Sequence, residues 1–181
     1  MEALEELAAR AASGDKAAFA DIYGVLMDSV YKYLFWNLGS TDDAEDLTEE
    51  VFLRCIVNIA SYNPKRGAFR SWIFRIAHNI LMDHHRRNKR RGDEPLKDEL
   101  HNGSAGTAER VEKKERARAL HKALDRLNAV QRQVITMKYF AEMNNAETAV
   151  ALGKSEGAIN AIQHRALHRL GNILEERGWV S

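Results

Sequence analysis

The segment Tyr62–Arg91, YNPKRGAFRSWIFRIAHNILMDHHRRNKRR, constrains the fold of this chain more than any other stretch. Its apolar residues recur at helical spacing: Phe69, Trp72, Ile73, Ile76, Ala77, Ile80 and Leu81. This spacing predicts a long helix that buries one face, with Trp72 packed in the core. The segment also contains one acid, Asp83, and nine cations: Lys65, Arg66, Arg70, Arg75, Arg86, Arg87, Lys89, Arg90 and Arg91. A helix with so one-sided a charge indicates a polyanionic partner.

Charge is distributed unevenly along the rest of the chain as well. The formal net charge of the 181 residues is only +1. Residues 1–62 carry twelve acidic and four basic side chains, whereas residues 63–92 carry one and nine. Such a chain can bind nucleic acid at one place without the non-specific affinity of a uniformly basic protein.

Helical periodicity continues through both ends of the chain, and no segment alternates like a strand, so we predict an all-α protein. The expected helices are Glu2–Ala12, Lys16–Leu38, Asp43–Ala60, Phe69–Arg91, Glu109–Leu127, a helix from a cap at Asn128 to Phe140, Ala146–Leu152 and Glu156–Arg177. The first four would form a bundle domain, residues 1–91. The last four would form a second small domain, residues 109–181.

Details of the first bundle follow from the same patterns. Thr41 or Asp42 is the expected cap of the third helix, whose acidic first turn suits the helix dipole. Tyr23 in the second helix and Ile56 in the third are expected to face inward. The only cysteine, Cys55, lies in an apolar run and is predicted to be a buried structural thiol.

Residues 92–108, GDEPLKDELHNGSAGTA, separate the two domains. They contain three glycines and a proline, and they show no apolar periodicity. We therefore predict an acidic, flexible linker.

The C-terminal domain has the layout of a helix-turn-helix: a short helix, a turn at Gly153, and a longer helix capped by Ser155. The residues expected to pack the two helices together are Ala149, Leu152, Ile159, Ile162, Leu167 and Leu170. The opposite face is polar, with Asn160, Gln163, His164, Arg165, His168 and Arg169 able to reach base edges and phosphates. An ordinary helical hairpin shares this layout, so the pattern alone leaves DNA binding open.

Other classes of function find little support in the sequence. No nucleophile–base set, P-loop or dinucleotide-binding glycine pattern is present, so we do not expect an enzyme or a cofactor. His78, His84 and His85 lack the spacing of a zinc pair and have no cysteine nearby, so we expect no metal. The acidic N-terminus does not resemble a signal peptide and no apolar run is long enough to cross a membrane. We expect a cytoplasmic protein that is not inserted in a membrane.

Three motifs in order resemble the extracytoplasmic-function (ECF, group IV) sigma factors of bacterial RNA polymerase. DDAEDLTEEVFLR looks like the polymerase-binding segment of this family, and FRSWIFRIAHNILMDHHRR looks like its promoter-melting segment. ALDRLNAVQRQVITMKYFAEMNNAETAVALGKSEGAINAIQHRALHRL looks like its second DNA-binding domain. The resemblance covers nearly the whole chain.

The resemblance implies an alternative sigma factor that binds core RNA polymerase and directs promoter recognition. Residues 1–91 would correspond to sigma region 2, and residues 109–181 to sigma region 4. The implied polymerase-binding residues are Asp46, Glu49 and Glu50. The candidates for the −10 element, read as a melted strand, are Arg66, Arg70, Arg75, Asn79, Arg86 and Arg87, with the loop Ser61–Ala68 and Asn79 forming a base pocket. The candidates for the −35 element are Asn160, His164, Arg165 and Arg169.

Two other interpretations remain open at this stage. One is a stand-alone helix-turn-helix regulator, which would need a dimer face or a ligand pocket. The other is a sigma-mimicking protein that sequesters an anti-sigma factor, although a mimic would have no need of the basic melting helix. The expected partners are core RNA polymerase, promoter DNA and an anti-sigma factor, and we expect the free protein to be a monomer.

Overall fold

The structure, a computed structural model, describes residues 3–91 and 108–176. Helices form the whole regular structure of these two ranges, which contain no strand, so the all-α prediction is confirmed. The helices are α1 (Leu4–Ala12), α2 (Lys16–Leu38), α3 (Thr41–Asn58), η1 (Ile59–Ser61), η2 (Pro64–Arg66), α4 (Phe69–Arg91), α5 (Ala108–Leu124), α6 (Ala129–Tyr139), α7 (Asn145–Leu152) and α8 (Glu156–Glu175). The expected linker, residues 92–108, lies outside the described residues except for its last position.

The start of α3 differs by one residue from the prediction. Ser40, not Thr41 or Asp42, is the cap, since its Oγ accepts a hydrogen bond from the backbone N–H of Asp43 at 3.2 Å. Ser40 has an extended backbone, as a cap requires, whereas Thr41 and Asp42 are already helical. At its other end α3 stops at Asn58 and is followed by the short 3-10 helix η1, so the predicted end at Ala60 was wrong.

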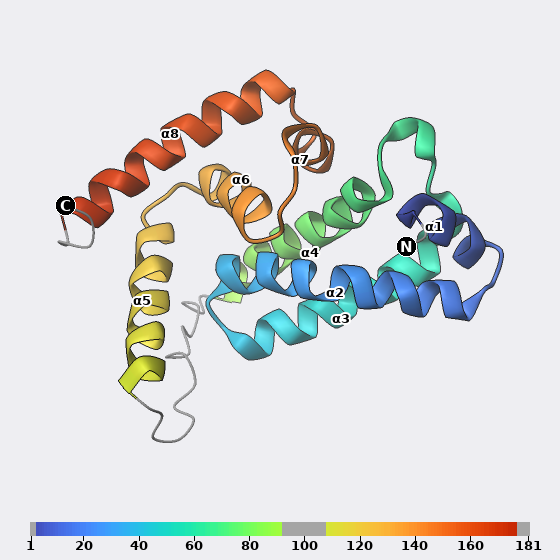
Figure 1. The fold of residues 1–181 in the computed structure, drawn as a ribbon, viewed down its shortest axis with the longest axis horizontal. Helices are drawn as coiled ribbons and strands as arrows, with labels where there is room; N and C mark the ends of the chain where they lie inside the picture. The colour runs from blue at the N-terminus through green and yellow to red at the C-terminus, as the bar shows by residue number, and fades with distance from the viewer. Residues whose placement is uncertain (1–2, 92–107, 177–181) are drawn as a thin grey trace.

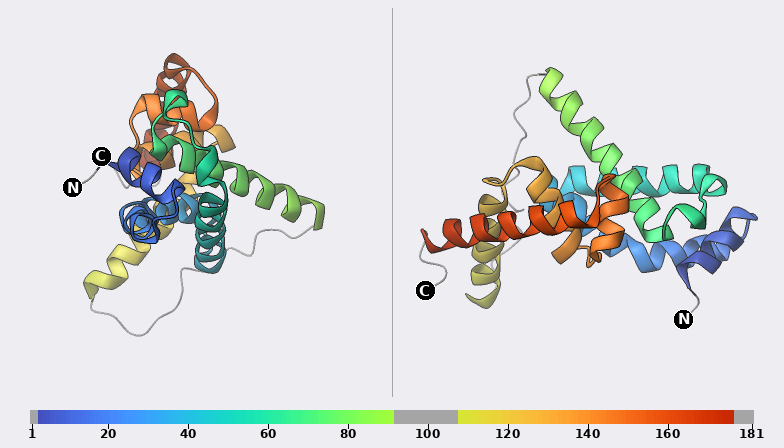
Figure 2. Two further views of the ribbon diagram at one scale, coloured as in Figure 1. Left: turned by 90° about the vertical axis from the view of Figure 1, so that its right-hand side faces the viewer. Right: turned by 90° about the horizontal axis from the view of Figure 1, so that it is seen from above.

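Helix α4 lies at the centre of the molecule, between α2 and α3 on one side and the C-terminal helices on the other (Figures 1 and 2). Its predicted stripe is buried at Phe69, Ile73, Ala77, Ile80 and Leu81, and Phe74 is buried with them. Trp72 and Ile76 are only half-buried, although both pack against the core.

Two residues that we expected to face inward are on the surface. Tyr23 is 42% exposed, with one face of its ring against Phe52 at 4.7 Å between centroids, and Ile56 is 47% exposed. Both lie at the edge of an apolar stripe whose centre already fills the space between α2 and α3. Cys55 is buried as predicted, and burial raises the pKa of its thiol to about 12.

The helix-turn-helix forms as its turn residues predicted. Asn128 and Gln131 form a reciprocal capping box at α6, Gly153 ends α7 in the left-handed conformation (φ 62°), and Ser155 caps α8. Ala149 and Ile159 pack with Val134 of α6, and Leu152 and Ile162 border that cluster. Leu167 was placed wrongly, because it is 42% exposed on the outer side of α8.

The N-terminal and C-terminal halves of the chain pack against each other. Helix α7 lies along α4, and α6 lies against α2 (Figure 1). Met137, Ala141, Met143 and Ala151 from the C-terminal half are buried in the same core as α2, α3 and α4. None of the described helices is long and apolar enough to cross a membrane.

Candidate nucleic-acid interface

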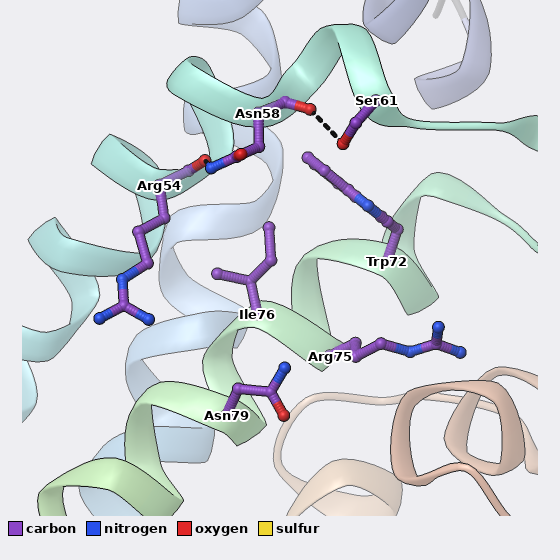
Figure 3. Close-up of a pocket in the computed structure, with 7 residues that line it drawn as sticks. All are labelled: Arg54, Asn58, Ser61, Trp72, Arg75, Ile76 and Asn79. Atoms are coloured by element: carbon purple, nitrogen blue, oxygen red, sulfur yellow. Dashed lines mark hydrogen bonds between the residues drawn. The ribbon is translucent and has the colours of Figure 1, made fainter.

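A pocket of about 260 Å³ lies where the end of α3 meets α4 (Figure 3). Its lining residues are Arg54, Asn58, Ser61, Trp72, Arg75, Ile76 and Asn79. It therefore has a flat aromatic and aliphatic wall, amides and hydroxyls that can form directed hydrogen bonds, and two cations. These are the groups that a site for an extruded base and its flanking phosphates needs.

A second cavity, also of about 260 Å³, adjoins the first on the side of the loop before α4. The two share Ser61, Trp72 and Arg75. The loop contributes Ser61, Tyr62, Asn63, Arg66, Gly67 and Ala68, and the C-terminal half contributes Val150. The structure thus brings the predicted loop and Asn79 to neighbouring cavities rather than to a single one.

The loop between α3 and α4 is held by its own hydrogen bonds. The Asn63 side chain accepts from the backbone N–H of Lys65 at 3.0 Å, and the Tyr62 hydroxyl donates to the carbonyl of Gly67 at 3.2 Å. The Tyr62 ring also packs edge-on against Phe69 at 5.1 Å between centroids. Burial raises the pKa of Tyr62, and the nearby Glu5 raises it further, so the hydroxyl remains a donor. A base would meet a preformed rim.

The candidate −10 residues on α4 divide between two faces of the helix. At 3.6 residues per turn, Arg75, Asn79 and Arg86 fall within roughly 40° of one another, on one face. All three are exposed. Arg70 lies on another side of α4, half-buried, with its guanidinium 5.8 Å from the Phe74 ring centroid. The structure does not place Arg70 with the other three.

The basic end of α4 projects from the body of the molecule (Figure 2). Arg86 and Arg87 are exposed there, and Arg86 forms an ion pair with Asp83, one turn earlier. The hydrogen bond from Arg86 lowers the pKa of the Asp83 carboxyl. Arg66 is also exposed, in η2 at the rim of the second cavity.

The acidic residues of α3 share one face of that helix with apolar residues that the sequence analysis overlooked. Asp46 and Glu49 are exposed, and Glu50 forms an ion pair with Arg54. Leu53 and Val57 continue the same face and are 65% and 79% exposed. Their spacing from Asp46, seven and eleven residues, was a readable sign that they stand outside the inward stripe. The face changes from acidic to apolar along its length.

The −35 candidates lie on the exposed side of α8 and are spread around it. Asn160, His164, Arg165 and Arg169 are all exposed. Asn160 and Arg165 are roughly 140° apart around the helix at 3.6 residues per turn. The side-chain amide of Asn145, in α7, donates to Oδ1 of Asn160. On the other flank, Arg165 borders a groove formed with Asn128–Gln131 of α6. A duplex would have to contact both flanks to meet all four residues.

In the described part of the chain, no group of three or more His, Cys, Asp or Glu side chains could hold a metal ion. His84 lies 3.9 Å from Asp43 and next to Asn88, whereas His78 faces the C-terminal half near Lys154. The three histidines of α4 are therefore not gathered at one point.

Comparison with known families agrees with this geometry. The Sigma-70 region 2 family matches residues 13–91, and the Sigma-70 region 4 family matches residues 123–171. The sequence is 30% identical over 176 residues to the ECF RNA polymerase sigma factor SigW of Bacillus subtilis, a match that covers 90% of this chain and 92% of SigW. This chain belongs to the ECF sigma factors. It is an alternative sigma factor that binds RNA polymerase and directs promoter recognition, and it is not an enzyme.

Other relatives extend the comparison. The ECF sigma factor BldN of Streptomyces coelicolor is 32% identical over 179 residues, a match that covers 94% of this chain and 66% of BldN. The solved structure of CnrH in complex with the cytosolic domain of CnrY has a TM-score of 0.76 at 25% identity, covering 97% of this chain and 99% of CnrH. The sigma factor RpoE of Bartonella quintana, solved with the anti-sigma factor NepR, has the same fold, with a TM-score of 0.70 at 20% identity, covering 87% of this chain and 96% of RpoE.

Proposed function

We propose that this ECF sigma factor reads the −10 element with the two cavities beside α4, the −35 element with α8, and the polymerase core with α3. The observation that supports the first assignment most directly is the pocket lined by Trp72, Arg75 and Asn79. It combines a ring for stacking, an amide for reading a base edge and a cation for a phosphate. In this division residues 1–91 act as sigma region 2 and residues 109–181 as sigma region 4.

The −10 assignment predicts a specific defect for Asn79→Ala. Core binding should be unchanged, and transcription from a promoter with a duplex −10 element should fall by tenfold or more. Run-off transcription with reconstituted holoenzyme, together with binding of a fluorescent −10 single strand by that holoenzyme, measures both quantities. Asn88→Ala, a half-buried amide on the same helix but outside both cavities, is the matched control. Equal activity of the two variants would remove Asn79 from the site.

We infer that core polymerase docks on the face of α3 that contains Asp46, Glu49, Glu50, Leu53 and Val57. The acidic part would steer a basic partner surface, because opposite charges raise the rate of encounter, and the exposed apolar part would be buried in the complex. A leucine and a valine that are more than half exposed, side by side on one face, are best explained by a partner that covers them.

Two double variants separate these contributions. Glu49→Lys with Glu50→Lys should slow association with core and make it less dependent on salt, whereas Leu53→Ala with Val57→Ala should speed dissociation. The control is Asp21→Lys with Asp28→Lys, which changes two exposed acids on α2. Surface plasmon resonance on immobilised core polymerase gives both rates, and unchanged rates in both test variants would exclude this docking face.

For the −35 element we propose that Asn160, His164 and Arg165 contact base edges in the major groove and that Arg169 contacts phosphate. Arg165→Ala should reduce transcription that depends on the −35 element by about tenfold to a hundredfold, which corresponds to the loss of one bidentate base contact. Lys122→Ala, an exposed cation on α5, is the control. A loss of core binding in Arg165→Ala would instead place this residue against the polymerase, and the proposal would be wrong.

We further propose that the chain belongs to group IV, that it works in the cytoplasm where promoters are, and that it pairs with an anti-sigma factor. Two observations support these statements: only residues 92–122 separate the two matched regions, and the CnrH structure that resembles this chain contains the cytosolic domain of CnrY. Affinity capture of the tagged chain from its own host, followed by mass spectrometry, tests the last point. Recovery of core subunits without an inhibitor would exclude the anti-sigma factor under the growth condition used.

A further inference from the structure

Two of the arginines proposed to hold promoter DNA are bound to the other half of the chain. Nη2 of Arg75 donates to the backbone carbonyl of Val150 at 2.7 Å, and Nη2 of Arg70 donates to the carbonyl of Ala141. Figure 3 shows the Arg75 guanidinium extending away from Arg54, towards the ribbon of the C-terminal half. Both guanidiniums are therefore directed at protein rather than towards the position of a strand.

Val150 also covers the loop before α4. A β-carbon built on Gly67 would lie 3.0 Å from Cγ1 of Val150 and 3.8 Å from its Cβ, so the two residues are in direct contact. The Val150 side chain forms one wall of the second cavity. Helix α7 thus sits on the loop that the −10 assignment needs to be open.

The rest of the contact between the halves is packed and specifically hydrogen-bonded. Trp36 of α2 lies on Phe140 with 4.5 Å between ring centroids. The Asn37 side-chain amide donates to the Thr136 hydroxyl at 2.8 Å, and Arg132 donates to the Asn37 carbonyl at 3.0 Å. Asn37 and Thr136 are buried, and buried polar groups that find their partners only across an interface favour one fixed arrangement.

This arrangement cannot read both promoter elements at once. The five residues from Val150 to Ser155 span at most roughly 18 Å, and Asn160 lies roughly 8 Å further along α8. The −35 face is therefore within about 25 Å of Arg75. Elements centred about 25 base pairs apart are separated by roughly 85 Å of duplex at 3.4 Å per step. The halves must separate before the protein can bind a promoter.

We propose that the C-terminal half is an intramolecular inhibitor of the N-terminal half. In the free chain, α6 and α7 occupy the DNA-facing side of α4 and the loop before it, with no second protein required, and binding to core polymerase separates the halves. The consequence for promoter binding rests on the proposed function, but the closed contact itself does not. The chain between Arg91 and Ala108 can span roughly 55 Å when extended, which permits the separation.

A reversible covalent lock tests this directly. The distance of 3.8 Å between the β-carbon position of Gly67 and Cβ of Val150 is typical of a disulfide, so Gly67→Cys with Val150→Cys should cross-link under mild oxidation. The oxidised protein should bind core weakly and lose at least tenfold in run-off transcription, and reductant should restore both. Comparison of one protein in two redox states cancels any strain from a side chain at Gly67, where φ is +137°. The single-cysteine variants, which retain Cys55, should not respond to reductant.

Each result decides between alternatives. Failure of the disulfide to form would show that the halves do not meet in solution, and full activity of the cross-linked protein would show that the contact does not inhibit. Either result overturns the proposal. If the disulfide forms but the unmodified chain gives no transcript with core, the proposed function fails and the closed contact stands.

Opening the contact gives the opposite effect in a chain without new cysteines. Trp36→Ala removes the stacking on Phe140 and should raise the affinity of the free chain for a −10 single strand, without core, by about tenfold, because the competent open state becomes more populated. Tyr31→Ala removes a ring that stacks only within α2, against Phe35, and should leave the affinity unchanged. Fluorescence anisotropy measures the affinity and circular dichroism verifies the helical fold. An unchanged affinity in a folded Trp36→Ala variant would contradict the proposal, and if the variant unfolds, the cross-link decides.

Discussion

At the scale of single residues, side chains on α4 have neighbours from both halves of the chain, and His78 is the one whose charge depends on pH. It is half-buried, and its Nδ1 is buried without a hydrogen-bond partner among the described residues. Burial lowers the pKa of His78, and the positive charge of Lys154, at the turn between α7 and α8, lowers it further. Protonation would place a second positive charge in the contact between the halves.

The sign of the pH dependence follows from this shift. Because the pKa of His78 is lower in the folded chain than in the unfolded chain, the unfolded chain binds a proton more readily. The stabilisation is complete above the unfolded value of about 6.5 and is lost as the pH falls below it. We expect the free energy of unfolding of the wild type to decrease more between pH 7.5 and pH 5.5 than that of His78→Gln. Urea titrations at both pH values measure the difference, and His164→Gln, an exposed histidine of α8, should behave as the wild type.

At the scale of helices, capping residues determine where the C-terminal elements begin. In α6 the Asn128 side chain accepts from the backbone N–H of Gln131 at 2.9 Å, and the Gln131 side chain accepts from the backbone N–H of Asn128 at 3.3 Å. Since α6 contacts both α2 and α8, its first turn supports two interfaces. A loss there would not be confined to one helix.

The expected cost of removing this cap is moderate. Asn128→Ala should lower the free energy of unfolding by about 1 kcal/mol, whereas Asn128→Asp keeps an acceptor at the cap and should cost a few tenths of that. Chemical denaturation followed by circular dichroism compares the two variants. Equal losses would mean that Asn128 acts through the groove it shares with Arg165 rather than through the cap.

At the scale of the whole molecule, Arg132 connects the halves from a half-buried position. Its guanidinium donates to the carbonyl of Leu124 at 3.1 Å, to the carbonyl of Asn37 at 3.0 Å, and to the Asp125 carboxylate. Burial lowers the pKa of Arg132 to about 10, so the side chain remains charged at neutral pH. One cation thus supports a helix end and an interface between residues almost a hundred positions apart.

Arg132→Leu should therefore destabilise the chain by at least about 2 kcal/mol, because it leaves buried acceptors without their donor. The matched control is Arg126→Leu, which breaks only the exposed ion pair with Glu176 at 3.1 Å and should cost less than about 1 kcal/mol. Guanidinium denaturation measures both values. Similar values for the two variants would show that the contact between the halves adds little to the stability of the closed form.

Much of this molecule could be read from local sequence patterns. The helix period identified the α4 stripe, and Asn128, Gly153 and Ser155 defined helix boundaries through short-range hydrogen bonds and backbone preference. Errors arose at stripe edges, as at Ile56 and Leu167, where exposure depends on how closely a neighbouring helix approaches. Periodicity contains no information about that approach, since it describes one helix at a time.

The sequence by itself determined the all-helical class, the basic helix and the family motifs, because each depends on residues within a few turns of one another. Only the tertiary structure decided that the two halves close on each other, and that Arg70 and Arg75 donate to carbonyls of the C-terminal half. The bond from Arg75 to Val150 joins residues seventy-five positions apart, and no local pattern encodes such a pair. The same cations can serve an interface in the closed chain and a nucleic acid in an open one, since a guanidinium donates equally well to a carbonyl or to a phosphate.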